Sequence, residues 1–153
     1  MIITKLNKFL QPTSLLTRTS LNLLLLRIVV GAAFIIHGWA KMQNPAGWMG
    51  SESSTPGFLQ FLASVSEFGG GIAWILGLIT PIASLGIAST MTVAVFKTIA
   101  VMNFPFVNLK GGGSYELPLT YFCIAILFMV TGPGKFSLDY MIFKGRTGIK
   151  DHE

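Results

Sequence analysis

Long apolar stretches separated by short polar segments dominate this chain of 153 residues. Four of these stretches approach the roughly 20 residues that an α-helix needs to cross the hydrocarbon core of a bilayer. They span residues 21–42, 58–79, 82–103 and 115–132. The pattern predicts an all-α membrane protein, built as an antiparallel bundle of four transmembrane helices.

The polar segments predict how these helices connect. Residues 43–57 contain two prolines, and residues 104–114 contain one proline and three consecutive glycines, so both segments are typical of loops. Thr80-Pro81 allows only a very tight turn, which makes the second and third helices an antiparallel hairpin. Pro118 falls in the first turn of the fourth helix, where the missing N–H would be unpaired anyway.

The two ends of the chain predict short elements on the membrane surface. Residues 1–20 are polar and basic with apolar residues at helical spacing, which predicts an interfacial helix. In the tail over residues 133–153, a Gly-Pro-Gly sequence at 132–134 ends the fourth helix, and Ser137 is placed to cap a short inner-face helix. We expect a single domain over residues 1–153, because two substantial domains would need a longer chain.

Charge distribution predicts the environment and the orientation. Only 11% of residues are charged, against about 25% in an average soluble domain. The net charge of +5 comes from residues at the ends of apolar runs and in the tails, not from a basic stripe, which argues against nucleic acid as a partner. The tails carry more lysine and arginine than the loops on the opposite side. The positive-inside rule therefore predicts that both termini lie in the cytoplasm.

Ionisable side chains within the spans are the strongest indication of function, because a charge inside hydrocarbon is costly. With a rise of about 1.5 Å per residue, one such group from each helix falls roughly 5–10 Å outside the midplane. The four residues are His37, Glu67, Lys97 and Glu116. Together they predict a small polar pocket open toward the outer leaflet. The structural alternative is a set of ion pairs that only holds the bundle together.

Two helical faces combine charged residues with small ones, at the 3.6-residue period of an α-helix. In the first helix the face consists of Arg27, Gly31, Phe34, Gly38 and Lys41. In the second helix it consists of Glu67, Gly70, Gly71, Trp74 and Leu78. Small residues let membrane helices approach closely, so these faces predict helix contacts.

Two further charged residues have predicted structural roles. Arg27 lies on the inner half of the first helix, within reach of Asp139 at the inner boundary, and we expect the two to form an ion pair. Lys41 lies at the outer end of the same helix and is expected to anchor it at the interface.

The sequence lacks the residues that a haem site, a metal site or a redox pair of cysteines would need. His37 is the only histidine in a span, so a haem held by two facing histidines is not expected. No spacing of His, Cys and carboxylate residues suits a metal. Cys123 is the single cysteine, so neither an intramolecular disulfide nor a CxxC redox pair can form. We expect no metal and no tightly bound cofactor.

Several segments, taken in their order, resemble the DoxX family of small four-helix membrane proteins. They are Leu26-Arg27-Ile28-Val29-Val30-Gly31, His37-Gly38-Trp39-Ala40-Lys41-Met42, Ser66-Glu67 followed by Gly70-Gly71 and Leu76-Gly77-Leu78, Gly112-Gly113-Ser114-Tyr115-Glu116, and Gly132-Pro133-Gly134-Lys135-Phe136-Ser137-Leu138-Asp139. The resemblance covers about residues 21–142. Pro81 stands where family members often have a basic residue.

The resemblance implies a prokaryotic cytoplasmic (inner) membrane as the location, and a setting in quinone-linked redox complexes of respiration or oxidative stress. It implies an accessory subunit of an oxidoreductase and not a stand-alone enzyme. The pocket of this subunit would bind a quinone-like or other lipophilic ligand, and membrane lipids would surround the protein. One alternative is a non-catalytic assembly subunit that binds another membrane protein or a second copy of itself. Another is a small transporter, which would need a homo-oligomer because four spans are few.

Overall fold

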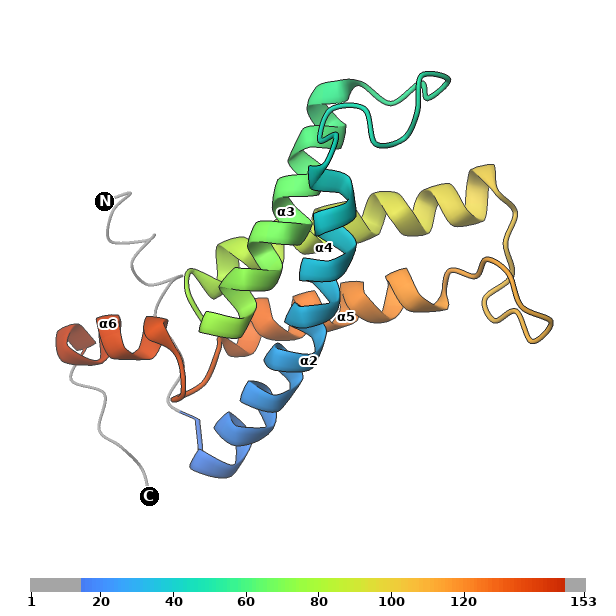
Figure 1. Cartoon of the computed structure of the whole chain (residues 1–153). Helices are drawn as coiled ribbons and strands as arrows, with labels where there is room; N and C mark the ends of the chain where they lie inside the picture. Colours follow the sequence, from blue (N-terminus) through green and yellow to red (C-terminus); the bar gives the residue numbers. More distant parts are fainter. Residues whose placement is uncertain (1–14, 148–153) are drawn as a thin grey trace.

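The computed structural model describes residues 15–147, and every regular element among them is a helix. The elements are α2 (Thr17–Met42), α3 (Gly57–Leu76), α4 (Thr80–Phe96), the π-helix η1 (Lys97–Val101), α5 (Glu116–Thr131) and α6 (Leu138–Thr147) (Figure 1). By length and composition, three helices can cross a membrane: α2, α3, and α4 continued through η1. Helix α5 is apolar but shorter, with 16 residues. The prediction of an all-helical membrane protein is confirmed in this form.

The predicted interfacial helix over residues 1–20 and the end of the C-terminal tail lie mostly outside the described residues. Where the predicted spans can be compared, the helices begin and end within a few residues of expectation. The largest difference is in the third span, which was expected to continue to residue 103. Its α-helical part ends at Phe96, and a π-helical turn follows.

The helices form two pairs, α2 with α3 and α4 with α5, and contacts between α3 and α4 join the pairs. Figure 1 shows how the pairs diverge: α2 ends and α3 begins at the top of the view, whereas η1 ends and α5 begins at the right. The turn between α3 and α4 lies at the opposite end of the molecule from these two places. The four helices are therefore not a set of parallel rods.

Glycines bring α2 and α3 into backbone contact. A Cβ atom on Gly31 would lie 2.8 Å from the carbonyl oxygen of Gly71, and one on Gly71 would lie 2.7 Å from the carbonyl oxygen of Gly31. A Cβ atom on Gly38 would collide with the backbone of Phe68. The contact predicted from the two small-residue faces is confirmed.

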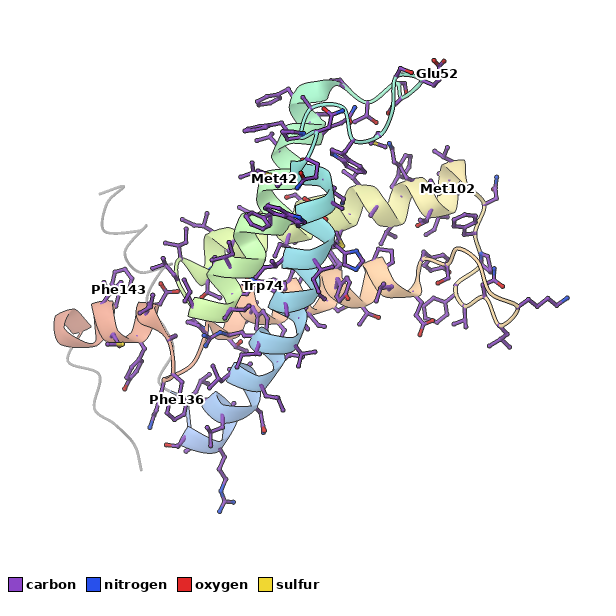
Figure 2. The ribbon with its side chains drawn as sticks, viewed as in Figure 1. Met42, Glu52, Trp74, Met102, Phe136 and Phe143 are labelled. Atoms are coloured by element: carbon purple, nitrogen blue, oxygen red, sulfur yellow. The ribbon has the colours of Figure 1, made fainter. Side chains whose placement is uncertain are left out.

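Trp74 is the centre of the core and is fully buried (Figure 2). Its ring packs edge-on against Phe34 of α2 at 5.4 Å and Phe128 of α5 at 4.9 Å, measured between ring centroids. Its indole N–H donates a hydrogen bond of 2.9 Å to Ser84 Oγ on α4. This single side chain on α3 therefore contacts all three other long helices, and its polar N–H is satisfied.

The turn between α3 and α4 lies a few residues earlier than the predicted Thr80-Pro81. Helix α3 ends at Gly77, which has the left-handed conformation with φ 63°, and Ile79 also has a positive φ of 45°. Thr80 and Pro81 belong to the first turn of α4. Proline suits a first helical turn and glycine suits a helix end, so the local chemistry favours this arrangement.

Arg27 connects several segments at the end of the molecule where α3 ends. Its side chain is fully buried, and within the described part of the chain its guanidinium donates to four backbone carbonyl oxygens. Two belong to the last turn of α3, Trp74 at 2.6 Å and Ile75 at 2.9 Å. The other two, Pro133 at 2.6 Å and Phe136 at 3.0 Å, lie between α5 and α6. Arg27 thus ties α2 to the ends of two other helices.

Asp139 stabilises the same end from α6. Its buried carboxylate accepts hydrogen bonds from the backbone N–H groups of Ile79 at 2.7 Å and Thr80 at 2.9 Å, where α4 begins. Helix N-termini have unpaired N–H groups and favour negative charge. No ion pair joins Asp139 to Arg27 within 4.0 Å, in contrast to our expectation. Each side chain bonds to backbone groups at helix ends or between helices instead.

Ser137 has the capping role predicted for it. Its hydroxyl oxygen accepts a hydrogen bond of 3.1 Å from the backbone N–H of Tyr140, and α6 begins at the next residue, Leu138. This is the geometry of an N-cap serine.

The first prediction concerns the α2–α3 contact. Gly38→Ala should destabilise the fold by about 1–3 kcal/mol, because the added methyl group cannot fit against the Phe68 backbone. The matched control is Gly69→Ala on α3, where a Cβ meets nothing within 4 Å. That variant should be neutral or up to about 1 kcal/mol more stable, since alanine favours helix. Equilibrium unfolding in mixed micelles measures both, and equal effects would contradict the contact.

The second prediction concerns Arg27. Arg27→Lys should destabilise the protein by about 1–3 kcal/mol for each carbonyl oxygen left without a donor, because an ammonium group lacks the planar fork of the guanidinium. Arg18→Lys, an exposed change in the same helix, should stay within about 0.5 kcal/mol. The same unfolding measurement applies. A stable Arg27→Lys protein would show that the carbonyl contacts contribute little.

Candidate functional site

A charged pair links the end of α2 to the middle of α3. Lys41 Nζ lies 2.5 Å from Glu67 Oε1, and the exposed fractions of the two side chains are 22% and 2%. The Lys41 ammonium also lies 4.4 Å from the centroid of the Trp48 ring, a cation–π distance. Lys41 is therefore more than the interface anchor that we expected: it neutralises a buried carboxylate.

Two cavities adjoin this pair, and both are lined in part by Lys41 and Glu67. The smaller has a volume of about 170 Å³ and lies where α2 and α3 face α4 and α5. His37 lines it from α2, and Tyr121 lines it from α5. Phe34 and Tyr121 form an aromatic contact in its wall, with ring centroids 4.9 Å apart. This cavity combines ring surfaces with an imidazole, an ammonium and a carboxylate.

The larger cavity has a volume of about 410 Å³ and lies between α3 and α4. Its walls are mainly apolar, and the loop over residues 43–56 contributes Trp48, Met49 and Thr55. Lys97, the first residue of η1, also lines it. The Lys97 ammonium donates a hydrogen bond of 2.8 Å to Thr55 Oγ1 and lies 3.7 Å from Met49 Sδ.

The structure divides the four predicted pocket residues among different places. Glu67 lines both cavities, His37 lines the smaller and Lys97 lines the larger. Glu116 lines neither; it is exposed as the first residue of α5. The neighbouring α5 residues Leu117 and Pro118 do line the smaller cavity together with Glu67. The predicted common depth took no account of the side of α5 on which each residue lies, and Glu116 lies outside the cavity wall.

Sequence reasoning missed the residues that fix the loop over the larger cavity. The side chain of Gln60, only 4% exposed, donates to Thr55 O at 2.9 Å and accepts from the Met49 backbone N–H at 3.0 Å. Ser64 Oγ donates to Pro45 O at 3.1 Å. Residues 60, 64 and 67 are polar at helical spacing inside an apolar run, a signal that could have identified this buried polar face.

The arrangement can bind small lipophilic molecules at a polar end and can exchange protons. The imidazole of His37 can donate or accept a hydrogen bond, and the Glu67 carboxylate in the same cavity wall can accept one. Among residues 15–147, the structure shows no group of three His, Cys, Asp or Glu side chains that could hold a metal. Cys123 is exposed and lines neither cavity.

Comparison with known proteins places the chain in a family. The family model described as DoxX matches residues 22–100. An uncharacterized protein of Haemophilus influenzae is 35% identical over 121 residues, which is 78% of this chain and 89% of that protein. The inner membrane protein YqjF of Escherichia coli is 29% identical over 80% of this chain and 93% of its own length. The putative oxidoreductase CatD of Bacillus subtilis is 29% identical over 80% of this chain and 88% of its own length.

No solved structure matches the chain significantly. The family match covers most of α2, all of α3 and α4, and most of η1. These elements carry Arg27, the Lys41–Glu67 pair and Lys97. The protein is a membrane protein that belongs to the DoxX family.

Proposed function

We propose that this chain is a subunit of a quinone-linked oxidoreductase in a bacterial inner membrane, which it crosses four times with both termini in the cytoplasm. The names of two relatives, an inner membrane protein and a putative oxidoreductase, support this setting. Helix α5 is the fourth crossing in this proposal. Its 16 residues span about 24 Å, somewhat less than the roughly 30 Å hydrocarbon core, so the bilayer must thin slightly around it.

The proposed ligand is a quinone-type ring in the smaller cavity. The observation that carries this proposal is that His37, Tyr121 and the Lys41–Glu67 pair line one cavity of ring-sized volume. A quinone presents carbonyl oxygens that accept hydrogen bonds and flat faces that pack on aromatic and apolar groups. The residues present fit these needs, while the isoprenoid tail would leave toward the lipid.

Each residue has a distinct role in this proposal. The imidazole of His37 donates a hydrogen bond to a ligand oxygen and exchanges a proton with it. The Glu67 carboxylate accepts a proton at the same wall, and Lys41 holds that carboxylate in place at 2.5 Å. When bound, the quinone would supply the electron-carrying chemistry. The chain itself binds the ring, orients it and moves protons.

The alternative of an assembly subunit was based on small-residue faces that another membrane protein could bind. In the structure, Gly31, Gly38 and Gly71 pack within the chain, between α2 and α3. These faces are therefore occupied, which favours the ligand-binding function over the assembly function.

The third prediction tests the smaller cavity. His37→Ala and Glu67→Gln should each weaken binding of a short-chain ubiquinone or menaquinone analogue about tenfold, the value of roughly one lost hydrogen bond. Quenching of tryptophan fluorescence in the purified full chain reports the affinity. Glu116→Gln is the matched control for Glu67→Gln, because Glu116 lines neither cavity, and it should bind the analogue as wild type does.

Two outcomes would contradict the proposal. Unchanged affinity in both His37→Ala and Glu67→Gln would place the quinone elsewhere. No binding of either analogue, together with a membrane protein that co-purifies in a fixed ratio, would favour the assembly function. Unfolding midpoints of the variants should be recorded alongside, so that a weakened affinity is not confused with a weakened fold.

A further inference from the structure

Lys97 carries a charge that no described carboxylate neutralises. Its ammonium contacts the hydroxyl of Thr55 at 2.8 Å and the thioether of Met49 at 3.7 Å, and both groups are uncharged. No carboxylate oxygen among the described residues lies within 4.0 Å of it. Lys41, the other lysine that lines the larger cavity, is paired with Glu67. A partly buried cation without a counter-ion is costly, so this site favours an anion.

The cavity beside Lys97 has the shape and lining for an apolar chain. On α4 and η1 its lining residues run from Gly86 to Lys97, which corresponds to about 16 Å along the helix. On α3 they run from Leu59 to Glu67. The volume of about 410 Å³ is more than twice that of the smaller cavity, and most of its surface is apolar. Lys97 and Thr55 lie at the loop end of this groove.

We propose that the larger cavity binds a single-chain lipid carboxylate, such as a long-chain fatty acid, with its carboxylate on Lys97 and its chain along α3 and α4. The ammonium of Lys97 and the hydroxyl of Thr55 would donate hydrogen bonds to the carboxylate oxygens. A neutral quinone has no need of the unpaired charge. The site is therefore separate from the proposed quinone site, although the Lys41–Glu67 pair lines both cavities.

The fourth prediction tests this site with the full chain in zwitterionic nanodiscs and native mass spectrometry. Palmitate should bind one per chain, and hexadecanol, which has the same chain length without the charge, should bind at least tenfold more weakly. Lys97→Gln should lower palmitate affinity at least tenfold, whereas Lys97→Arg should keep most of it. Lys110→Gln removes an exposed lysine of the 104–114 loop and should bind as wild type does.

A second variant tests the chain-binding part without changing the charge. Ala63 lines the cavity, and Ala63→Leu would occupy part of its volume. This variant should weaken palmitate binding more than decanoate binding, because the shorter chain needs less of the groove. The comparison of two chain lengths within one variant keeps the test valid even if Lys97→Gln folds poorly.

Three results would overturn the proposal: equal binding of palmitate and hexadecanol, unchanged palmitate binding in Lys97→Gln, or preference for a phosphate-headed single-chain lipid over palmitate. His37→Ala, which tests the smaller cavity, should leave palmitate binding unchanged. Lys97→Gln should likewise leave quinone-analogue binding unchanged. The two proposals can therefore fail independently of each other.

Discussion

The buried guanidinium of Arg27 is the constraint on which the rest of the structure depends. A charge in an apolar interior must be solvated by protein groups, and a guanidinium has five N–H donors to satisfy. Arg27 uses the carbonyl oxygens of Trp74, Ile75, Pro133 and Phe136. Those oxygens belong to a helix end and a turn, where carbonyl groups can accept further hydrogen bonds; Trp74 O also accepts from the Gly77 backbone N–H at 3.1 Å. One side chain therefore fixes where α3 ends and where the segment after α5 returns to the bundle.

The carboxylate of Asp139 complements this arrangement at the neighbouring helix end. It accepts hydrogen bonds from the N–H groups that begin α4, and the Asp139 backbone N–H donates to Gly77 O at 2.8 Å. The positive group thus meets carbonyl groups at helix ends, and the negative group meets N–H groups at the start of a helix. The two charges stabilise one turn without contacting each other directly. With this end fixed, the helix pairs can diverge toward the other end, and both cavities lie on that side of Trp74.

Much of this fold could be predicted from local patterns in the sequence. Apolar length predicted the helices, the 3.6-residue period predicted the Arg27, Gly31 and Gly38 face, and a serine after Gly-Pro-Gly predicted the cap of α6. The partners of the charges could not be predicted in this way. Every residue has a carbonyl group, so sequence alone favours the visible acid, Asp139, over backbone oxygens as the partner of Arg27.

The candidate site was predictable only in part, for a related reason. Periodicity gives the face on which a residue lies, but it does not give the tilt of one helix against another. The divergence of the helix pairs divides His37, Glu67 and Lys97 between two cavities. Glu116 lines neither, although its neighbours Leu117 and Pro118 line the smaller one. The same divergence places Lys41 and Lys97 in different environments. Lys41 lies against α3 and pairs with Glu67, while the partners of Lys97 among residues 15–147 are a hydroxyl and a thioether. An unequal charge balance at two similar residues thus follows from helix geometry, and it is the reason that we propose different ligands for the two cavities.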